Sequence, residues 1–319
     1  METSVPATYL QLIRTAWTYI STGALRRLMW MRKGPVIAAL YPVGMLILQL
    51  LIAVGLGAVP HALLSGFGKI DALVGYLAWG VIIVAVLRWF KSKDNKFFAY
   101  YLVHDYAYSA RWRGANPEAL ETRMTTLADT IAAALTADVD EVLIVGHSSG
   151  AHLAVSILAD IMRSGRVPAG GPKLAFSSLG QVVPMMSFLP DAGRLCGDLA
   201  YLSTADNFTW IDVTAPGDGC AFALCDPVAA SGVAPADQKW PLIISAEFTQ
   251  TLQPATWKAL RWRFFRLHFQ YLCAFDRPKD YNYFQTIAGP MTLADRYAGR
   301  PPSKSRIDMV ASKYTSVTS

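Results

Sequence analysis

The sequence predicts an α/β protein in which a small, mostly parallel sheet is flanked by helices and preceded by a two-helix transmembrane hairpin. Two long apolar runs occur in the first third of the chain. After residue 97, short apolar runs alternate with helical patterns, which is typical of a parallel sheet covered on both faces. Within that region, residues 141–159 have the pattern of a buried strand, a tight turn and a helix, and the other candidate residues are placed relative to this segment.

The two apolar runs are long enough to cross a bilayer, which takes about 20 residues. Residues 36–59 contain no Asp, Glu, Lys or Arg, and residues 70–90 have one acidic residue near the start and one Arg near the end. We predict a transmembrane hairpin over 36–90 with a turn-rich link at 60–69, retained as an anchor because it begins too late for a signal peptide. The alternative is a pair of core helices or a re-entrant pair.

Basic residues gather outside the hairpin. The link has only Lys69, whereas the flanks carry Arg14, Arg26, Arg27, Arg32, Lys33, Arg88, Lys91, Lys93 and Lys96. The positive-inside rule then predicts a two-span membrane protein whose termini and main folded domain are cytoplasmic. Much of the excess that gives the net charge of +6 lies beside these membrane segments. No nucleic-acid-binding motif occurs, so membrane lipids rather than nucleic acid are the predicted partner.

Residues 1–35 form a predicted amphipathic segment. Apolar side chains recur every three or four residues, at Leu10, Ile13, Trp17, Ile20, Ala24 and Leu28. Such a helix either lies on a membrane surface or docks on the folded domain, and the sequence does not separate the two. Gly34-Pro35 is predicted to end it.

Residues 97–302 have the element order of one α/β domain. Strands are predicted at 97–103, 142–145, 173–179, 208–214 and 241–248, and helices at 117–134, 151–159 and 193–202. Asn116 is the predicted N-cap of the first of these helices, with Pro117 at its first position. Residues 303–319 are polar and aperiodic, and we predict a flexible tail.

The four cysteines give no sign of a metal centre. They stand at positions 196, 220, 225 and 273 without metal-type spacing. On the predicted cytoplasmic side they remain reduced, with packing as their default role. No cofactor and no metal are predicted.

Gly146-His147-Ser148-Ser149-Gly150 joins the apolar strand to the following helix. A Ser at such a sharp turn is strained and exposed, and the flanking glycines allow strand and helix to approach closely. The helix start offers free amides and a positive dipole end beside Ser148. This context favours a nucleophile elbow over a Gly-rich turn without chemistry.

Five histidines are candidates for the base. His61 lies in the hairpin link, His147 is expected to point away from its serine neighbour, and His152 is one turn along the helix. His104 ends the first predicted strand, where it could contribute to the oxyanion region. His268, after the last predicted strand, is therefore favoured as the base.

The acid is expected between the serine and the histidine. Asp212 lies inside a predicted strand, and Asp226 precedes a proline and is expected to shape a turn. Asp218 follows the strand in Ala215-Pro216-Gly217-Asp218-Gly219, at the edge where active groups gather. Asp218 is favoured over Asp212.

Together, GHSSG, the Asp of VTAPGD and the His of LHFQYL resemble an α/β-hydrolase, most closely a compact class 3 lipase-like serine hydrolase with an added membrane hairpin. The resemblance covers residues 97–300. It implies a Ser148, Asp218 and His268 triad, with oxyanion amides at Ser149 and near Asp105 or Tyr106.

The implied activity is a membrane-anchored serine hydrolase that cleaves an acyl ester or thioester, as an esterase, lipase or thioesterase does. An acyl-ester or lipid-like small molecule is the expected substrate. An acyltransferase would use the same triad. A catalytically silent scaffold that recruits partners to the membrane is the alternative from another class, and a transport component built on the hairpin is a further one.

Overall fold

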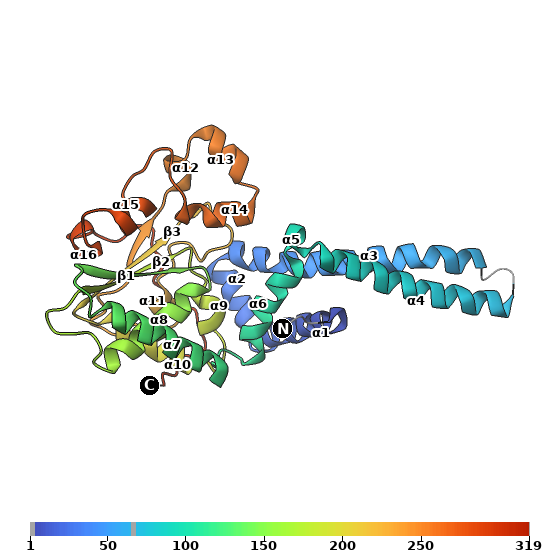
Figure 1. Cartoon of the computed structure of the whole chain (residues 1–319), viewed down its shortest axis with the longest axis horizontal. Helices are drawn as coiled ribbons and strands as arrows, with labels where there is room; N and C mark the ends of the chain where they lie inside the picture. Colours follow the sequence, from blue (N-terminus) through green and yellow to red (C-terminus); the bar gives the residue numbers. More distant parts are fainter. Residues whose placement is uncertain (1–3, 65–67, 319) are drawn as a thin grey trace. The chain divides into compact units, whose positions relative to one another are not determined.

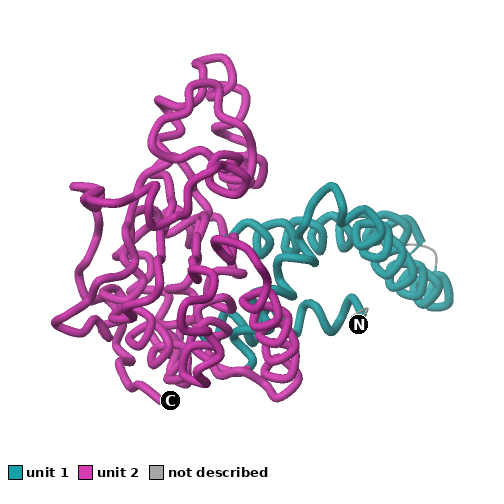
Figure 2. Tube along the Cα trace, turned by 60° about the vertical axis from the view of Figure 1, so that its left-hand side comes forward, with its two compact units in different colours: residues 1–18, 39–111 teal, residues 19–38, 112–319 magenta. Residues whose placement is uncertain are grey.

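The computed structural model describes residues 4–64 and 68–318. The chain forms two compact units (Figure 2): Met1–Thr18 with Ala39–Arg111, here called unit 1, and Tyr19–Ala38 with Trp112–Ser319, here called unit 2. Helices α1 and α3 each run from one unit into the other. The α/β class is confirmed, because unit 2 contains a four-stranded parallel sheet flanked by helices.

Unit 1 contains two helices that are long and apolar enough to cross a membrane, α3 (Lys33–Leu64) and α4 (Lys69–Ser92). They lie side by side (Figure 1), and the Trp79 indole nitrogen donates a hydrogen bond of 2.9 Å to the Val54 carbonyl. The break before the first helix lies at Arg32, whose backbone is extended, rather than at Gly34-Pro35. The predicted link is shorter than expected because α3 continues to Leu64, and residues 65–67 lie outside the described residues.

The N-terminal segment is two helices rather than one, α1 (Val5–Ser21) and α2 (Ala24–Met31). They separate at Gly23, whose φ of 75° is one that glycine adopts readily. In unit 1, Leu12 of α1 joins a small core, while Ile13 and Trp17 stay exposed. In unit 2, α2 packs against α9 (Val183–Ser187). Docking on the folded domain thus holds for α2, and the membrane-surface alternative stays a prediction for the exposed apolar side chains of α1.

The predicted strand at 97–103 is wrong. Phe97 ends the short helix α5 (Asp94–Phe97), and the following residues form α6 (Ala99–Arg111). The buried side chains of α6 include Tyr100, Val103, Ala107 and Ala110, spaced by three and four residues as on one face of a helix. The sequence predicts a strand here because aromatic residues have a high β-propensity, although the spacing of the buried residues is helical.

Unit 2 is built on strands β1 (Glu141–His147), β2 (Lys173–Leu179), β3 (Phe208–Thr214) and β4 (Leu242–Ser245), all parallel and in that order. Alternate residues of β2 enter different cores. Leu174 and Phe176 pack with helices α7 (Glu118–Ala134), α8 (Gly150–Arg163) and α10 (Gly193–Ser203), and Ala175 packs with the C-terminal elements. Both sheet faces are therefore covered, as a parallel sheet requires.

The remaining elements of unit 2 are short. They are α11 (Pro227–Ala230), α12 (Phe248–Thr251), α13 (Pro254–Leu260), α14 (Phe264–His268), the 3₁₀ helix η1 (Phe269–Leu272), α15 (Tyr283–Ala288) and α16 (Leu293–Arg296). Helix α7 begins one residue later than predicted, with Pro117 at the cap and the Asn116 amide donating to Glu121.

Residues 303–318, for which a flexible tail is predicted, have no helix or strand, and they contact the rest of unit 2. The Ile307 amide donates to the Leu224 carbonyl at 2.7 Å, and the Thr318 amide donates to the Gly193 carbonyl at 3.0 Å. Ala311 and Ser312 are buried. Backbone hydrogen bonds and these small side chains dock the segment on unit 2, a contact that polarity along the sequence does not reveal.

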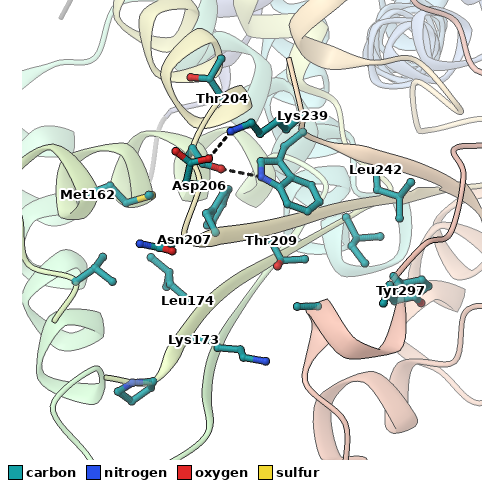
Figure 3. A pocket seen from close by; sticks show the side chains of 18 of the residues that line it. Met162, Lys173, Leu174, Thr204, Asp206, Asn207, Thr209, Lys239, Leu242 and Tyr297 are labelled. Atoms are coloured by element: carbon teal, nitrogen blue, oxygen red, sulfur yellow. Dashed lines mark hydrogen bonds and ion pairs between the residues drawn. The ribbon is translucent and has the colours of Figure 1, made fainter. Parts of the chain in front are cut away.

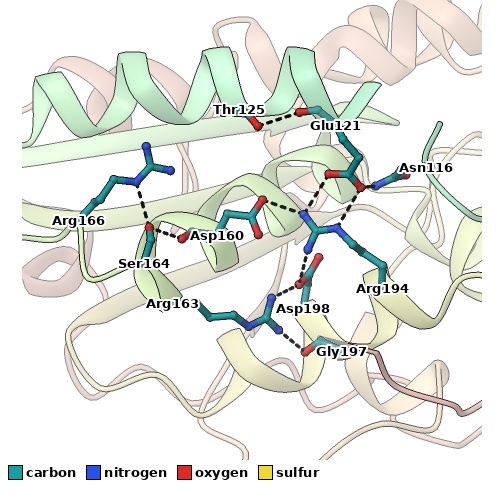
Figure 4. A network of polar contacts seen from close by, with 10 residues as sticks. All are labelled: Asn116, Glu121, Thr125, Asp160, Arg163, Ser164, Arg166, Arg194, Gly197 and Asp198. Carbon is teal, nitrogen blue, oxygen red and sulfur yellow. Dashed lines mark hydrogen bonds and ion pairs between the residues drawn. The ribbon is translucent and has the colours of Figure 1, made fainter. Parts of the chain in front are cut away.

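An ion-pair network joins the helices on one face of the sheet (Figure 4). Arg194 of α10 contacts Glu121 of α7 at 3.0 Å, Asp160 of α8 at 2.7 Å and Asp198 at 3.4 Å. The fully buried Asp198 also pairs with Arg163 of α8. Because a buried carboxylate is costly without partners, the network fixes α8, the helix that follows Ser148, against its neighbours.

Arg194→Met should lower the free energy of unfolding by about 2 kcal/mol, less than for a fully buried pair because the Arg194 side chain is 25% exposed. Urea unfolding of the full chain in detergent, followed by tryptophan fluorescence, measures this. Arg166→Met is the matched control, since its partner Asp129 is 65% exposed and about 0–1 kcal/mol is expected. Equal losses in the two variants would contradict the role of the network.

Candidate active site

Ser148 occupies the turn between β1 and α8 in a strained backbone conformation. Its φ is 56°, in the left-handed region that residues other than glycine rarely adopt. Its amide donates to the Leu179 carbonyl, at the end of β2, at 2.9 Å. The hydrogen bond ties the turn to the carboxyl end of the neighbouring strand, where active groups of parallel sheets gather.

The two glycines around Ser148 have different roles. A Cβ at Gly146 would lie 2.9 Å from the Ala151 Cα, so only glycine allows strand and helix to approach this closely. A Cβ at Gly150 meets nothing within 4 Å. The expected close approach therefore holds for Gly146 and not for Gly150.

Asp218 and His268 meet at the same edge of the sheet. Asp218 lies in the turn after β3, and His268 ends α14, beyond β4. The His268 Nδ1 donates to the Asp218 Oδ2 at 2.8 Å, and both side chains are buried. In a neutral imidazole this hydrogen bond favours the tautomer with its proton on Nδ1.

Two further donors hold the Asp218 carboxylate. The Cys220 amide donates to Oδ1 at 2.8 Å, and the Tyr271 hydroxyl donates to Oδ2 at 3.0 Å. Burial, together with the charge of Asp218, raises the pKa of Tyr271 well above its usual value, so the phenol keeps its proton. Tyr271 had no role in the sequence-based prediction, although its place one turn after His268 is a signal that both side chains face one way.

Ser148 and His268 border the same short segment of backbone. The Leu179 carbonyl binds the Ser148 amide, and a Cβ on the next residue, Gly180, would lie 3.0 Å from the His268 Cε1. The His268 Nε2 is buried without a hydrogen bond among the described residues, so it does not bond the Ser148 hydroxyl in this state. Catalytic hydrogen bonds are often long before substrate binds.

His147 supports His268 from the elbow side. Its Nε2 lies 2.9 Å from the His268 carbonyl oxygen, and the two imidazole rings are 4.6 Å apart. Burial, and secondarily the neighbouring His268, lowers the pKa of His147 to about 4. His147 is then a neutral Nε2–H donor at pH 7 that fixes the backbone of His268.

The competing carboxylates have structural partners. Asp212 lies fully buried within β3, where its Oδ2 accepts from the Ser178 hydroxyl at 2.7 Å. Asp226 caps α11 by accepting from the Val228 and Ala229 amides, which is the turn-shaping role expected for it. Of the three candidates, Asp218 is the one hydrogen-bonded to His268.

The two amides predicted to bind an oxyanion lie in different structural positions. Ser149 stands at the N-terminus of α8, where the first amides of a helix have no intrahelical partner. Tyr106 lies in the interior of α6, and an amide there is bonded to the carbonyl four residues earlier. The Tyr106 assignment is therefore wrong. His104 also lies in α6, where its Nδ1 contacts Gln11 at 2.6 Å.

Among the described residues, Asp218, Cys220 and His268 form a group that could hold a metal ion, with ligand atoms within 4.8 Å of one another. The Asp218 carboxylate already accepts three hydrogen bonds, one of them from the His268 Nδ1. Protein donors therefore already satisfy the carboxylate, as in a hydrogen-bonded carboxylate–histidine pair.

A cavity of about 1060 Å³ lies at the other edge of the sheet (Figure 3). Lys173, Phe208 and Leu242, at the starts of β2, β3 and β4, help to line it. Its cations are already neutralised in the pairs Lys173–Asp295, Lys239–Asp206 and Arg300–Asp280. Because the cavity lies where these strands begin, it is separate from the site at their carboxyl ends.

Asp212→Asn should make stability less dependent on pH. Burial raises the pKa of Asp212 to about 8, so the folded state keeps a proton that the unfolded state releases near pH 4. Stability then falls as pH rises between these values, and the variant lacks this loss. Melting temperatures of both proteins between about pH 6 and about pH 9 test this. Parallel losses in the two proteins would refute the buried, protonated state.

Comparison of the chain with protein-family models, curated proteins and solved structures found no match. The fold stands as an α/β unit with a four-stranded parallel sheet, together with two apolar helices that could span a membrane. Its function is therefore inferred from the chemistry of Ser148, Asp218 and His268.

Proposed function

We propose that the protein is a membrane-anchored serine hydrolase that cleaves an acyl ester or thioester. The observation that carries the proposal is the buried Asp218–His268 hydrogen bond, with a His268 Nε2 that has no hydrogen-bond partner in the described chain and lies near the Ser148 turn. A buried base whose second nitrogen is held by a carboxylate is the arrangement that activates a neighbouring hydroxyl.

In the proposed reaction the Ser148 hydroxyl attacks the acyl carbonyl as its proton passes to the His268 Nε2. Asp218 stabilises the imidazolium without taking the proton. The Ser149 amide and the dipole of α8 stabilise the oxyanion. The imidazolium then protonates the leaving alcohol or thiol. In the second half a water, activated by His268, releases the acid from the acyl-enzyme.

Anchoring through α3 and α4 is part of the proposal. The excess of Lys and Arg outside the hairpin favours a cytoplasmic position for both termini and for the catalytic unit. An apolar acyl substrate suits a site tethered to lipid. Acyl transfer to an alcohol or amine would use the same residues and differs only in the acceptor of the second step.

Ser148→Ala should abolish labelling by a fluorophosphonate probe and lower the rate of p-nitrophenyl ester hydrolysis by about 10⁴-fold or more, because the nucleophile is lost. His268→Ala should cause a similar loss. An acyl-chain series of these esters would define the preferred substrate. Folded wild-type protein that shows no Ser148-dependent labelling would instead support the scaffold alternative.

Asp218→Asn should lower kcat by about 10²–10⁴-fold, because the asparagine no longer fixes the tautomer of His268. Asp212→Asn is the matched control, since Asp212 contacts Ser178 rather than His268, and a change of at most a few-fold is expected. Steady-state ester hydrolysis by the two variants measures the ranking. A larger loss in Asp212→Asn would show that the acid is misassigned.

A further inference from the structure

The segment that leads to His268 has an unusual composition. Residues 248–275 contain no Asp or Glu, but they contain Lys258, Arg261, Arg263 and Arg266. Aromatic residues alternate with these cations in Arg261-Trp262-Arg263-Phe264-Phe265-Arg266. Cations beside Trp and Phe are typical of protein surfaces that lie in the headgroup layer of a membrane.

These side chains face outward. Trp262 is 72% exposed, Phe264 47% and Phe269 52%. Arg261, Arg263 and Arg266 are also exposed, and none of the three pairs with a carboxylate of the described chain. The surface of Arg261, Trp262, Arg263, Phe264, Arg266 and Phe269, here called the aromatic–basic patch, is thus apolar and carries uncompensated positive charge.

The patch rests on the turn that carries Asp218. A Cβ at Gly217 would lie 2.7 Å from the Trp257 ring, and one at Gly219 would lie 3.4 Å from the Phe264 ring. The glycines on both sides of Asp218 therefore contact α13 and α14, and the chain continues from Phe264 to His268 within one helix.

The start of α3 meets the same turn within unit 2. A Cβ at Gly34 would lie 3.2 Å from the Gly219 carbonyl oxygen, and the Arg32 Nε donates to the Ala223 carbonyl at 3.0 Å. The helix that is apolar enough to enter a membrane thus begins on the residues that support the patch.

We propose that the aromatic–basic patch docks on an anionic membrane surface. The Arg side chains attract acidic headgroups, and each cation near such a surface favours the docked state by about fivefold. Trp262, Phe264 and Phe269 enter the interface, where exposed aromatic rings are most favourable. Docking also shields an apolar surface that water would otherwise cover.

One consequence concerns the substrate and rests on the proposed hydrolase function. A docked patch puts the approach to Asp218 and His268 at the headgroup layer. The substrate class would then be acyl esters that reside in the bilayer, with the ester bond at the depth of the headgroups. The docking itself involves no chemistry at Ser148, so it can be tested without any measure of activity.

Hydrogen exchange of the full chain in nanodiscs, one copy per disc, tests the docking. Peptides covering residues 255–270 should exchange at least about fivefold more slowly in phosphatidylcholine with phosphatidylglycerol than in phosphatidylcholine alone, since each of the three arginines contributes about that factor. Added salt should remove the difference, because it screens surface charge. Arg261→Gln, Arg263→Gln and Arg266→Gln combined should abolish it, and Trp262→Ser should reduce it.

Arg123→Gln, on the exposed face of α7, is the matched control and should keep the full difference. Equal exchange of residues 255–270 in the two lipid compositions would overturn the proposal. Slower exchange that requires two copies per disc, whatever the lipid, would also overturn it and would identify a second chain as the occupant. Either result would leave the hydrolase proposal standing, because ester hydrolysis and probe labelling are measured separately.

Discussion

The site depends on one buried carboxylate. Removing the charge of Asp218 from water is costly, and the structure offsets this with three donors: the Cys220 amide, the His268 imidazole and the Tyr271 hydroxyl. Each donor comes from a segment that must be held in place to reach it. The carboxylate therefore fixes the turn after β3 together with α14 and η1, and a rigid His268 follows from the need to satisfy Asp218.

The parallel sheet explains why residues so far apart in the sequence meet. Its four strands run in chain order, so the segments after β1, β2, β3 and β4 leave the same edge side by side. Ser148 follows β1, Gly180 follows β2, Asp218 follows β3 and His268 lies beyond β4. Glycine after β2 is required because a side chain there would occupy the position of the Tyr271 ring.

Patterns within short windows were predictable, and contacts through space were not. The strands at 173–179 and 208–214 match the structure because β-branched and apolar runs bounded by turns carry their own signal. The predicted strand at 97–103 is wrong because aromatic residues are compatible with both a strand and a helix. The packing of one face of α6 stabilises the helix. Asp218 and His268 could be predicted from their positions after strands and from their order in the chain. The roles of Tyr271 and Gly180 depend on contacts with residues that are distant in the sequence, so they could not be predicted.

Strand β1 is an outermost strand of the sheet, and this restricts which amides could bind the oxyanion of the proposed reaction. In the described chain β1 pairs with β2 alone and lies at the edge of the sheet. The resemblance to hydrolases implied a second oxyanion amide from a loop after an earlier strand, but the residues predicted to form that strand are helical. The amides at the start of α8 follow directly after Ser148, and the first amides of a helix have no partner within it. In the proposed reaction, stabilisation of a negative oxygen beside Ser148 depends on the orientation of this helix, which Arg194 contacts through Asp160.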